Sequence, residues 1–90
     1  MALAILKIKM MPESPETDLE AIKKELAVVV EGMGAKLHSV EEEPIAFGLI
    51  AVIATIAWPE EKGIDEAEQK LSGIKGVVGA EVIDYRRAFG

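Results

Sequence analysis

The side chains that could carry out chemistry are few in this chain, and their spacing argues against a catalytic centre. The single histidine, His38, lies in a polar stretch, which favours a surface or half-buried role. Glu41, Glu42 and Glu43 are consecutive. Neighbouring side chains on an extended strand point to opposite faces, so the three carboxylates cannot all converge on one cation. We interpret them as a solvated sheet edge.

Other kinds of reactive site lack the residues that they need. The chain has no cysteine, which excludes disulfides, thiol catalysis and thiolate metal sites and fits a reducing compartment. The glycines stand singly at the ends of predicted elements rather than in a phosphate-binding loop. No Ser-His-Asp arrangement is visible either. We therefore expect no catalytic residues and no metal site.

Two features resist a purely structural interpretation. Phe47 is one of two phenylalanines and stands directly before Gly48, at the mouth of a long apolar run. Arg86 and Arg87 are adjacent in an otherwise acidic chain. An aromatic side chain beside arginines is typical of the centre of a protein-binding surface. The alternative is that Phe47 packs into the core and the arginines close the last strand; exposure of the Phe47 ring distinguishes the two.

Length and charge bound the remaining possibilities. The 90 residues predict a single domain, 1–90, with one modest core. The 16 acidic and 10 basic side chains give a net charge of −6. Such a surface repels phosphate backbones unless its cations cluster, so we expect no direct contact with nucleic acid. The apolar run Ile45–Trp58 is shorter than the roughly 20 residues of a spanning helix, and the first ten residues have no cleavage site. We expect a cytoplasmic protein without a membrane contact.

Hydrophobic periodicity in the first half of the chain predicts a strand, a helix and a second strand. Residues 3–12 alternate between apolar side chains and lysines, which is typical of a strand with one buried face. A helix is expected within residues 13–32, where Thr17 and Glu20 form a capping-box pattern and Gly32 and Gly34 end the apolar repeat. Residues 35–44 are more polar and are expected to form an edge strand.

The second half repeats the pattern of strand, helix and strand. Residues 47–58 are apolar on both faces, as in a central strand. Residues 64–74 are expected to form a short helix, with Asp65 as a possible cap. Residues 77–89 are expected to form the last strand.

The order of the elements predicts an α+β fold. Two right-handed β-α-β crossovers give a ferredoxin-like βαββαβ sandwich, in which a four-stranded antiparallel sheet in the order 4-1-3-2 carries both helices on one face. The first and third strands are the most apolar, which agrees with central positions. We also expect the start of the third strand and the end of the fourth to share one edge of the molecule. Phe47 would then lie beside Arg86 and Arg87.

This fold hosts many unrelated activities, so function must come from sites. An acylphosphatase-like enzyme would need an anion-binding arginine in the first loop, and "MMPESPETD" has none. The aromatic signature with which related sheets stack nucleic-acid bases is absent from the third strand. A small regulatory module that binds a metabolite or another protein remains an alternative.

Three segments carry a resemblance to a known family. "MPESPETDLEAIKKEL", "EEEPIAFGLIAV" and "LSGIKGVVGAEVIDYRR" together resemble the archaeal translation elongation factor 1-beta family and the C-terminal exchange domain of its eukaryotic counterparts. The similarity covers nearly the whole chain in collinear order. It implies a ferredoxin-like fold and a guanine-nucleotide exchange role on elongation factor 1-alpha, the GTPase that delivers aminoacyl-tRNA. No cofactor is implied, because the GTPase supplies the nucleotide and the magnesium.

The resemblance also implies which residues contact the partner. Phe47 matches the exposed aromatic residue that inserts into a pocket of the GTPase, and the loop that presents it comprises Pro44, Ile45, Ala46 and Gly48. The eukaryotic domain ends in a lysine that intrudes on the magnesium site. This chain ends in "RRAFG" without a lysine, so Arg86 and Arg87 are the cations expected to take its place, although they lie several residues earlier.

Overall fold

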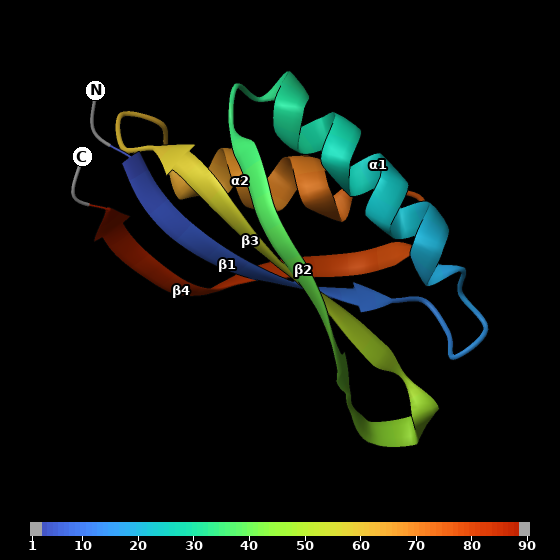
Figure 1. Ribbon diagram of the computed structural model, residues 1–90. Coiled ribbons are helices and arrows are strands. Elements are labelled where there is room, and N and C mark those ends of the chain that lie inside the picture. The colour runs from blue at the N-terminus through green and yellow to red at the C-terminus, as the bar shows by residue number, and fades with distance from the viewer. Residues whose placement is uncertain (1–2, 89–90) are drawn as a thin grey trace.

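The computed structural model describes residues 3–88, which form one antiparallel sheet and two α-helices. In chain order the elements are β1 (Leu3–Pro12), α1 (Leu19–Gly32), β2 (Lys36–Pro44), the 3₁₀ turn η1 (Ala46–Gly48), β3 (Ile50–Pro59), α2 (Ile64–Ser72) and β4 (Val77–Ala88). The sheet order is β2-β3-β1-β4, which is the predicted order read from the other edge. Both helices lie on one side of the sheet (Figure 1). The predicted ferredoxin-like sandwich is confirmed; residue 89 of the predicted last strand lies outside the described residues.

The core lies between the sheet and the helices, because only one face of the central strands is covered. Along β1, every second side chain is buried, while Lys7 and Lys9 turn to the uncovered face. This alternation is the one expected for a strand that has one buried face. The largest fully buried side chains come from both central strands and both helices: Trp58, Leu6, Ile8, Met10, Ile22, Leu26, Ile56, Leu71, Val30 and Val52.

The helix starts differ from the expectations in both cases. Asp18, not Thr17, caps α1, because its carboxylate accepts from the backbone N–H groups of Glu20 at 3.1 Å and Ala21 at 3.3 Å. The Thr17 hydroxyl instead accepts from the backbone N–H of Ser14 at 3.1 Å. The expected capping box is therefore wrong.

Helix α2 has no side-chain cap. Its N-cap residue is Gly63, and Asp65 lies within the first turn. The expected Asp65 cap is also wrong, although a carboxylate in the first turn still interacts favourably with the helix dipole.

The strand directions overturn one expectation about the ends of the molecule. Leu3 pairs with Pro59 on one side and with Ala88 on the other, in antiparallel ladders. Since β3 and β4 both run against β1, they run in the same direction as each other. The end of β4 therefore lies at the same end of the sheet as the end of β3, with β1 between them, and the start of β3 is at the opposite end.

The β2–β3 hairpin extends beyond the rest of the sheet and gives the molecule its elongated shape, with extents of 40 × 22 × 19 Å (Figure 1). β3 begins at Ile50 rather than at Phe47, because Phe47 has a φ of 64° that no strand residue adopts. Within residues 3–88, no helix is both long and apolar enough to cross a membrane.

Candidate partner-binding surface

The tip of the β2–β3 hairpin is a short turn closed by its own backbone. The N–H of Ile45 donates to the carbonyl of Leu49 at 2.8 Å, and the N–H of Leu49 donates to the carbonyl of Ala46 at 3.3 Å. Pro44 ends β2 before this turn and cannot extend the ladder, because proline has no N–H to donate. The turn therefore has a defined shape although little of it is buried.

Phe47 occupies the most unusual position in this turn. Its φ and ψ are 64° and 26°, and it is the one non-glycine residue with a positive φ among those that the structure describes. A left-handed conformation costs an L-residue with a side chain roughly 1–2 kcal/mol. Strained residues of this kind cluster at functional sites, where the surrounding structure maintains them.

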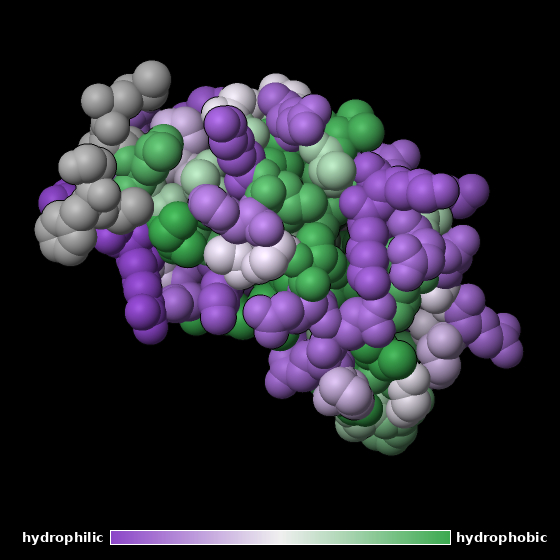
Figure 2. Space-filling model, viewed as in Figure 1, coloured by the Kyte–Doolittle hydropathy of each residue, from purple (hydrophilic) through white to green (hydrophobic). Residues whose placement is uncertain are grey.

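Phe47 is 92% exposed to solvent. The interpretation of Phe47 as a core residue is therefore wrong. Figure 2 shows pale and green, more hydrophobic atoms at the hairpin tip, below a surface that is largely purple. An apolar ring held in a strained conformation and away from the core has no stabilising role in the isolated chain. Of the two interpretations drawn from the sequence, exposure of Phe47 favours contact with a partner over a structural role.

Two lysines form ion pairs with glutamates of β2, one on each face of the sheet. Lys23 of α1 lies 2.6 Å from the Glu42 carboxylate on the helix side. Lys9 of β1 lies 3.6 Å from the Glu43 carboxylate on the uncovered side. The acidic run thus alternates between faces, as expected, and does not converge. The hydrogen bond that Lys23 donates to the Glu42 carboxylate is the main cause that raises the pKa of Lys23 above its ordinary value of 10.5.

The arginines lie at the other end of the molecule, at the end of the sheet where β3 also ends. The Arg87 Nε atom is 2.8 Å from Glu60, and the Arg86 Nε atom is 3.2 Å from Asp84. Both arginine side chains remain about four-fifths exposed, at 80% and 78%. The structure does not bring Phe47 together with Arg86 and Arg87, so the expectation of one shared surface is wrong. Glu60 was missed, because its place beside Arg87 follows only from the correct strand directions.

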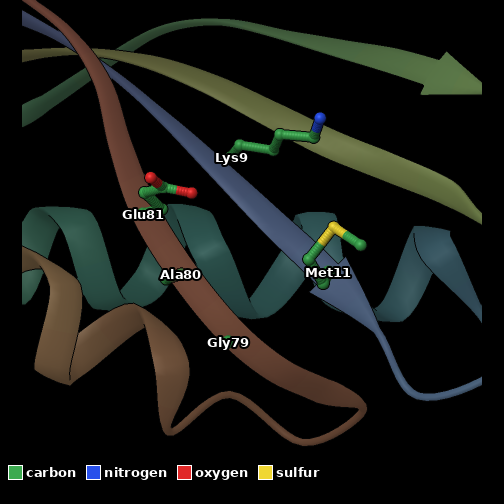
Figure 3. A pocket seen from close by; sticks show the side chains of 5 residues that line it. All are labelled: Lys9, Met11, Gly79, Ala80 and Glu81. Carbon is green, nitrogen blue, oxygen red and sulfur yellow. The ribbon is translucent and has the colours of Figure 1, made fainter. Parts of the chain in front are cut away.

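A shallow hollow of about 440 Å³ lies on the uncovered face of the sheet, between β1 and β4. Its lining includes Lys9, Met11, Gly79 and Glu81, and the Lys9 side chain extends away from Glu81 (Figure 3). Small-molecule sites usually combine an apolar cleft with a few converging polar groups. This hollow has no such convergence. Within the described part of the chain, no group of three or more His, Cys, Asp or Glu side chains is placed to hold a metal ion.

Comparison with known proteins identifies what this arrangement is similar to. Residues 5–87 match the family model described as the EF-1 guanine nucleotide exchange domain. Elongation factor 1-beta of Methanothermobacter thermautotrophicus is 49% identical over 84 residues, which covers 92% of this chain and 93% of that protein. The protein of the same name from Methanosarcina barkeri is 46% identical over 83 residues, covering 90% and 92%. That from Methanococcus maripaludis strain C5 is 41% identical over 85 residues, covering 93% and 96%.

Proposed function

This chain belongs to the EF-1 guanine nucleotide exchange domain family, and we propose that it promotes the release of GDP from elongation factor 1-alpha and its replacement by GTP. The family and the names of the relatives support a nucleotide exchange role in translation elongation. The exchange itself makes and breaks no covalent bond, so the chain acts as a regulator of a GTPase. In this proposal the whole chain, 1–90, works as one exchange domain in the cytoplasm.

The observation that carries the proposal is the exposure of the Phe47 ring at the hairpin tip. Aromatic side chains are enriched at the centres of protein interfaces because they bury a large apolar area with few rotatable bonds. The proposed binding loop comprises Pro44, Ile45, Ala46, Phe47 and Gly48. Its closed turn holds the ring in one orientation before binding, which lowers the entropy lost on association.

Nucleotide exchange requires that this loop bind the nucleotide-poor state of the GTPase more tightly than the GDP-bound state. In a GTPase, magnesium and the phosphate-binding loop hold the diphosphate. A factor that binds the nucleotide-poor state more tightly than the GDP-bound state must lower the affinity for GDP by the same ratio, because the two affinities are linked. Insertion of the Phe47 ring into the partner supplies that differential affinity if the pocket that receives it is open only when the nucleotide is loosely held. The nucleotide and the magnesium come from the partner.

Arg86 and Arg87 provide a second, separate contact in this proposal. They lie at the end of an elongated molecule of about 40 Å, opposite to the hairpin tip (Figure 1). A partner that touches both ends must therefore extend along this length. Each arginine already has a carboxylate neighbour, and such exposed pairs are worth at most about 1 kcal/mol. The guanidinium groups can therefore exchange these neighbours for stronger acceptors, such as phosphate oxygens, at small cost.

The test compares two variants that each remove an exposed apolar side chain. Phe47→Ala should weaken binding to nucleotide-free elongation factor 1-alpha by at least about 2 kcal/mol, or roughly 30-fold, and should slow the release of fluorescent GDP accordingly. Val28→Ala is the matched control, because Val28 is 71% exposed and belongs to α1 rather than to the proposed binding loop. Equal GDP release by wild type, Phe47→Ala and Val28→Ala would show that Phe47 is no anchor. Absence of any acceleration by the wild-type chain would refute the proposed function itself.

A further inference from the structure

The last strand leaves one long side of its backbone without a neighbouring strand. β4 is 12 residues long and forms one edge of the sheet (Figure 1). Among residues 3–88, its one strand neighbour is β1. The N–H and C=O groups on the free side of an edge strand are a ready template for pairing with a further strand. A long edge strand therefore favours association between molecules unless another feature interrupts it.

The two edges of the sheet differ in the side chains that they expose. At the β2 edge, every exposed side chain is polar or charged apart from Pro44, and charges and proline discourage strand pairing. β4 instead exposes three large apolar side chains, Val78 at 67%, Ile83 at 46% and Tyr85 at 44%. Such side chains stabilise cross-strand pairs. The β4 edge is therefore the one at which a further strand would add.

A carboxylate from α2 is bonded to the backbone of β4 near the middle of the strand. The N–H of Val82 donates to Oε2 of Glu68 at 3.0 Å. A backbone N–H carries one hydrogen, so this donor is already used and is not available to a further strand. A hydrogen bond to a carboxylate is also stronger than one to a backbone carbonyl. An incoming strand would therefore have to break a good hydrogen bond before it could pair here.

The ladder between β1 and β4 is irregular at the same place. Lys7 pairs with Asp84, whereas the next residue of β1 pairs with Val82. Ile83 is therefore an extra residue opposite this step of β1. A bulge of this kind bends the strand and increases its twist, and bulges are one of the means by which edge strands avoid pairing. The bulge and the carboxylate from α2 thus interrupt the β4 edge at one position.

The strand that fits this edge is β4 of a second copy of the chain. Antiparallel pairing about a two-fold axis at Tyr85 places Asp84 of each copy opposite Arg86 of the other, because both are one residue from the axis. Opposite charges and aromatic pairs stabilise antiparallel strands. In this register Val82 also lies within the paired segment. We propose that the β4 edge is a self-pairing surface and that Glu68 keeps two copies apart by occupying the Val82 N–H.

Two substitutions at Glu68 that change the net charge equally test this inference on the full chain. Glu68→Ala removes the acceptor, whereas Glu68→Gln keeps an oxygen that can accept from the Val82 N–H. Pairing in the wild type breaks two hydrogen bonds to carboxylates, each worth roughly tenfold or more in an equilibrium constant. Sedimentation equilibrium should therefore give Glu68→Ala a self-association constant at least about 100-fold above that of the wild type. Glu68→Gln should associate about tenfold more weakly than Glu68→Ala.

A further substitution locates the surface. In the Glu68→Ala background, Arg86→Asp places carboxylates opposite each other and should return the chain to a monomer. Lys24→Asp is the matched control, because it makes the same charge change at an exposed position of α1 and should leave the dimer intact.

The fluorescence of the buried Trp58 checks that each variant is folded. Equal association of Glu68→Ala and Glu68→Gln would show that net charge, not the hydrogen bond to Val82, keeps the copies apart, which overturns the inference. A monomeric Glu68→Ala chain, or a dimer that survives Arg86→Asp, would overturn it as well. These measurements use no GTPase, so their outcome is independent of the proposed exchange function.

Discussion

Replacement of Phe47 by glycine should stabilise the isolated chain while it weakens the interaction with the partner. The left-handed conformation of Phe47 costs a residue with a side chain roughly 1–2 kcal/mol, whereas glycine adopts it freely. Glycine also gives the unfolded chain more freedom, which offsets about 0.5–1 kcal/mol of this gain. Phe47 is 92% exposed, so removal of its ring loses little buried apolar area. The free energy of unfolding should therefore rise by about 0.5–1 kcal/mol.

The assay is urea unfolding monitored through Trp58, the single tryptophan, which is fully buried. Phe47→Ala is the matched variant, because alanine removes the ring and keeps the left-handed strain. Its midpoint should stay near that of the wild type, and Phe47→Gly should unfold at a higher urea concentration than Phe47→Ala. A loss of about 3–5 kcal/mol in either variant is what truncation of a core phenylalanine costs. That loss would refute the reasoning, because the ring would then have to pack against the rest of the molecule.

Three further outcomes follow from contacts described above. Asp18→Ala should lower the free energy of unfolding by about 0.5–2 kcal/mol in urea titrations, since it removes the cap of α1; an unchanged midpoint would place the cap elsewhere. Glu42 raises the pKa of Lys23, so the stabilisation from this pair is complete well below pH 10.5 and is lost as the pH rises through the raised pKa. The difference in the free energy of unfolding between wild type and Glu42→Gln should therefore shrink over that pH range. A constant difference would contradict the pairing. The double variant Arg86→Ala and Arg87→Ala should promote GDP release from elongation factor 1-alpha more slowly than the wild type does. Added salt should lower the GDP release rate of the wild type more than that of the variant. Equal salt dependence of the two rates would exclude a role for these charges.

Most of the fold could be predicted because it follows from local alternation. The buried positions Leu6, Ile8 and Met10 come directly from the period of two in the first strand, and the apolar third strand required a central position. The cap of α1 was misplaced by one residue, because Thr17 and Asp18 are both good capping residues and adjacent. The Ser14 N–H donates to the Thr17 hydroxyl, and this bond within the preceding turn leaves Asp18 as the residue that caps the helix.

The errors about the site have a different cause. The place of Arg86 and Arg87 depends on strand direction, and a single wrong direction moved them from one end of the sheet to the other. The position of Phe47 in the sequence left both a core role and an exposed role open, and the family resemblance implied the exposed one. Its strained backbone conformation has no local signal in the sequence.

The strain at Phe47 and the closed turn around it belong to one physical arrangement. An anchor that binds a transient, nucleotide-poor state gains most if its own conformation is fixed in advance, since every degree of freedom lost on binding subtracts from the differential affinity that drives exchange. A flexible tip would let Phe47 relax out of the left-handed region and spread its ring over many orientations. The closed turn and the lysines that pair with Glu42 and Glu43 each remove part of that freedom. The strained conformation of Phe47 is therefore adopted when the chain folds, and under the proposed role of Phe47 the affinity for the partner retains the full contribution of the ring.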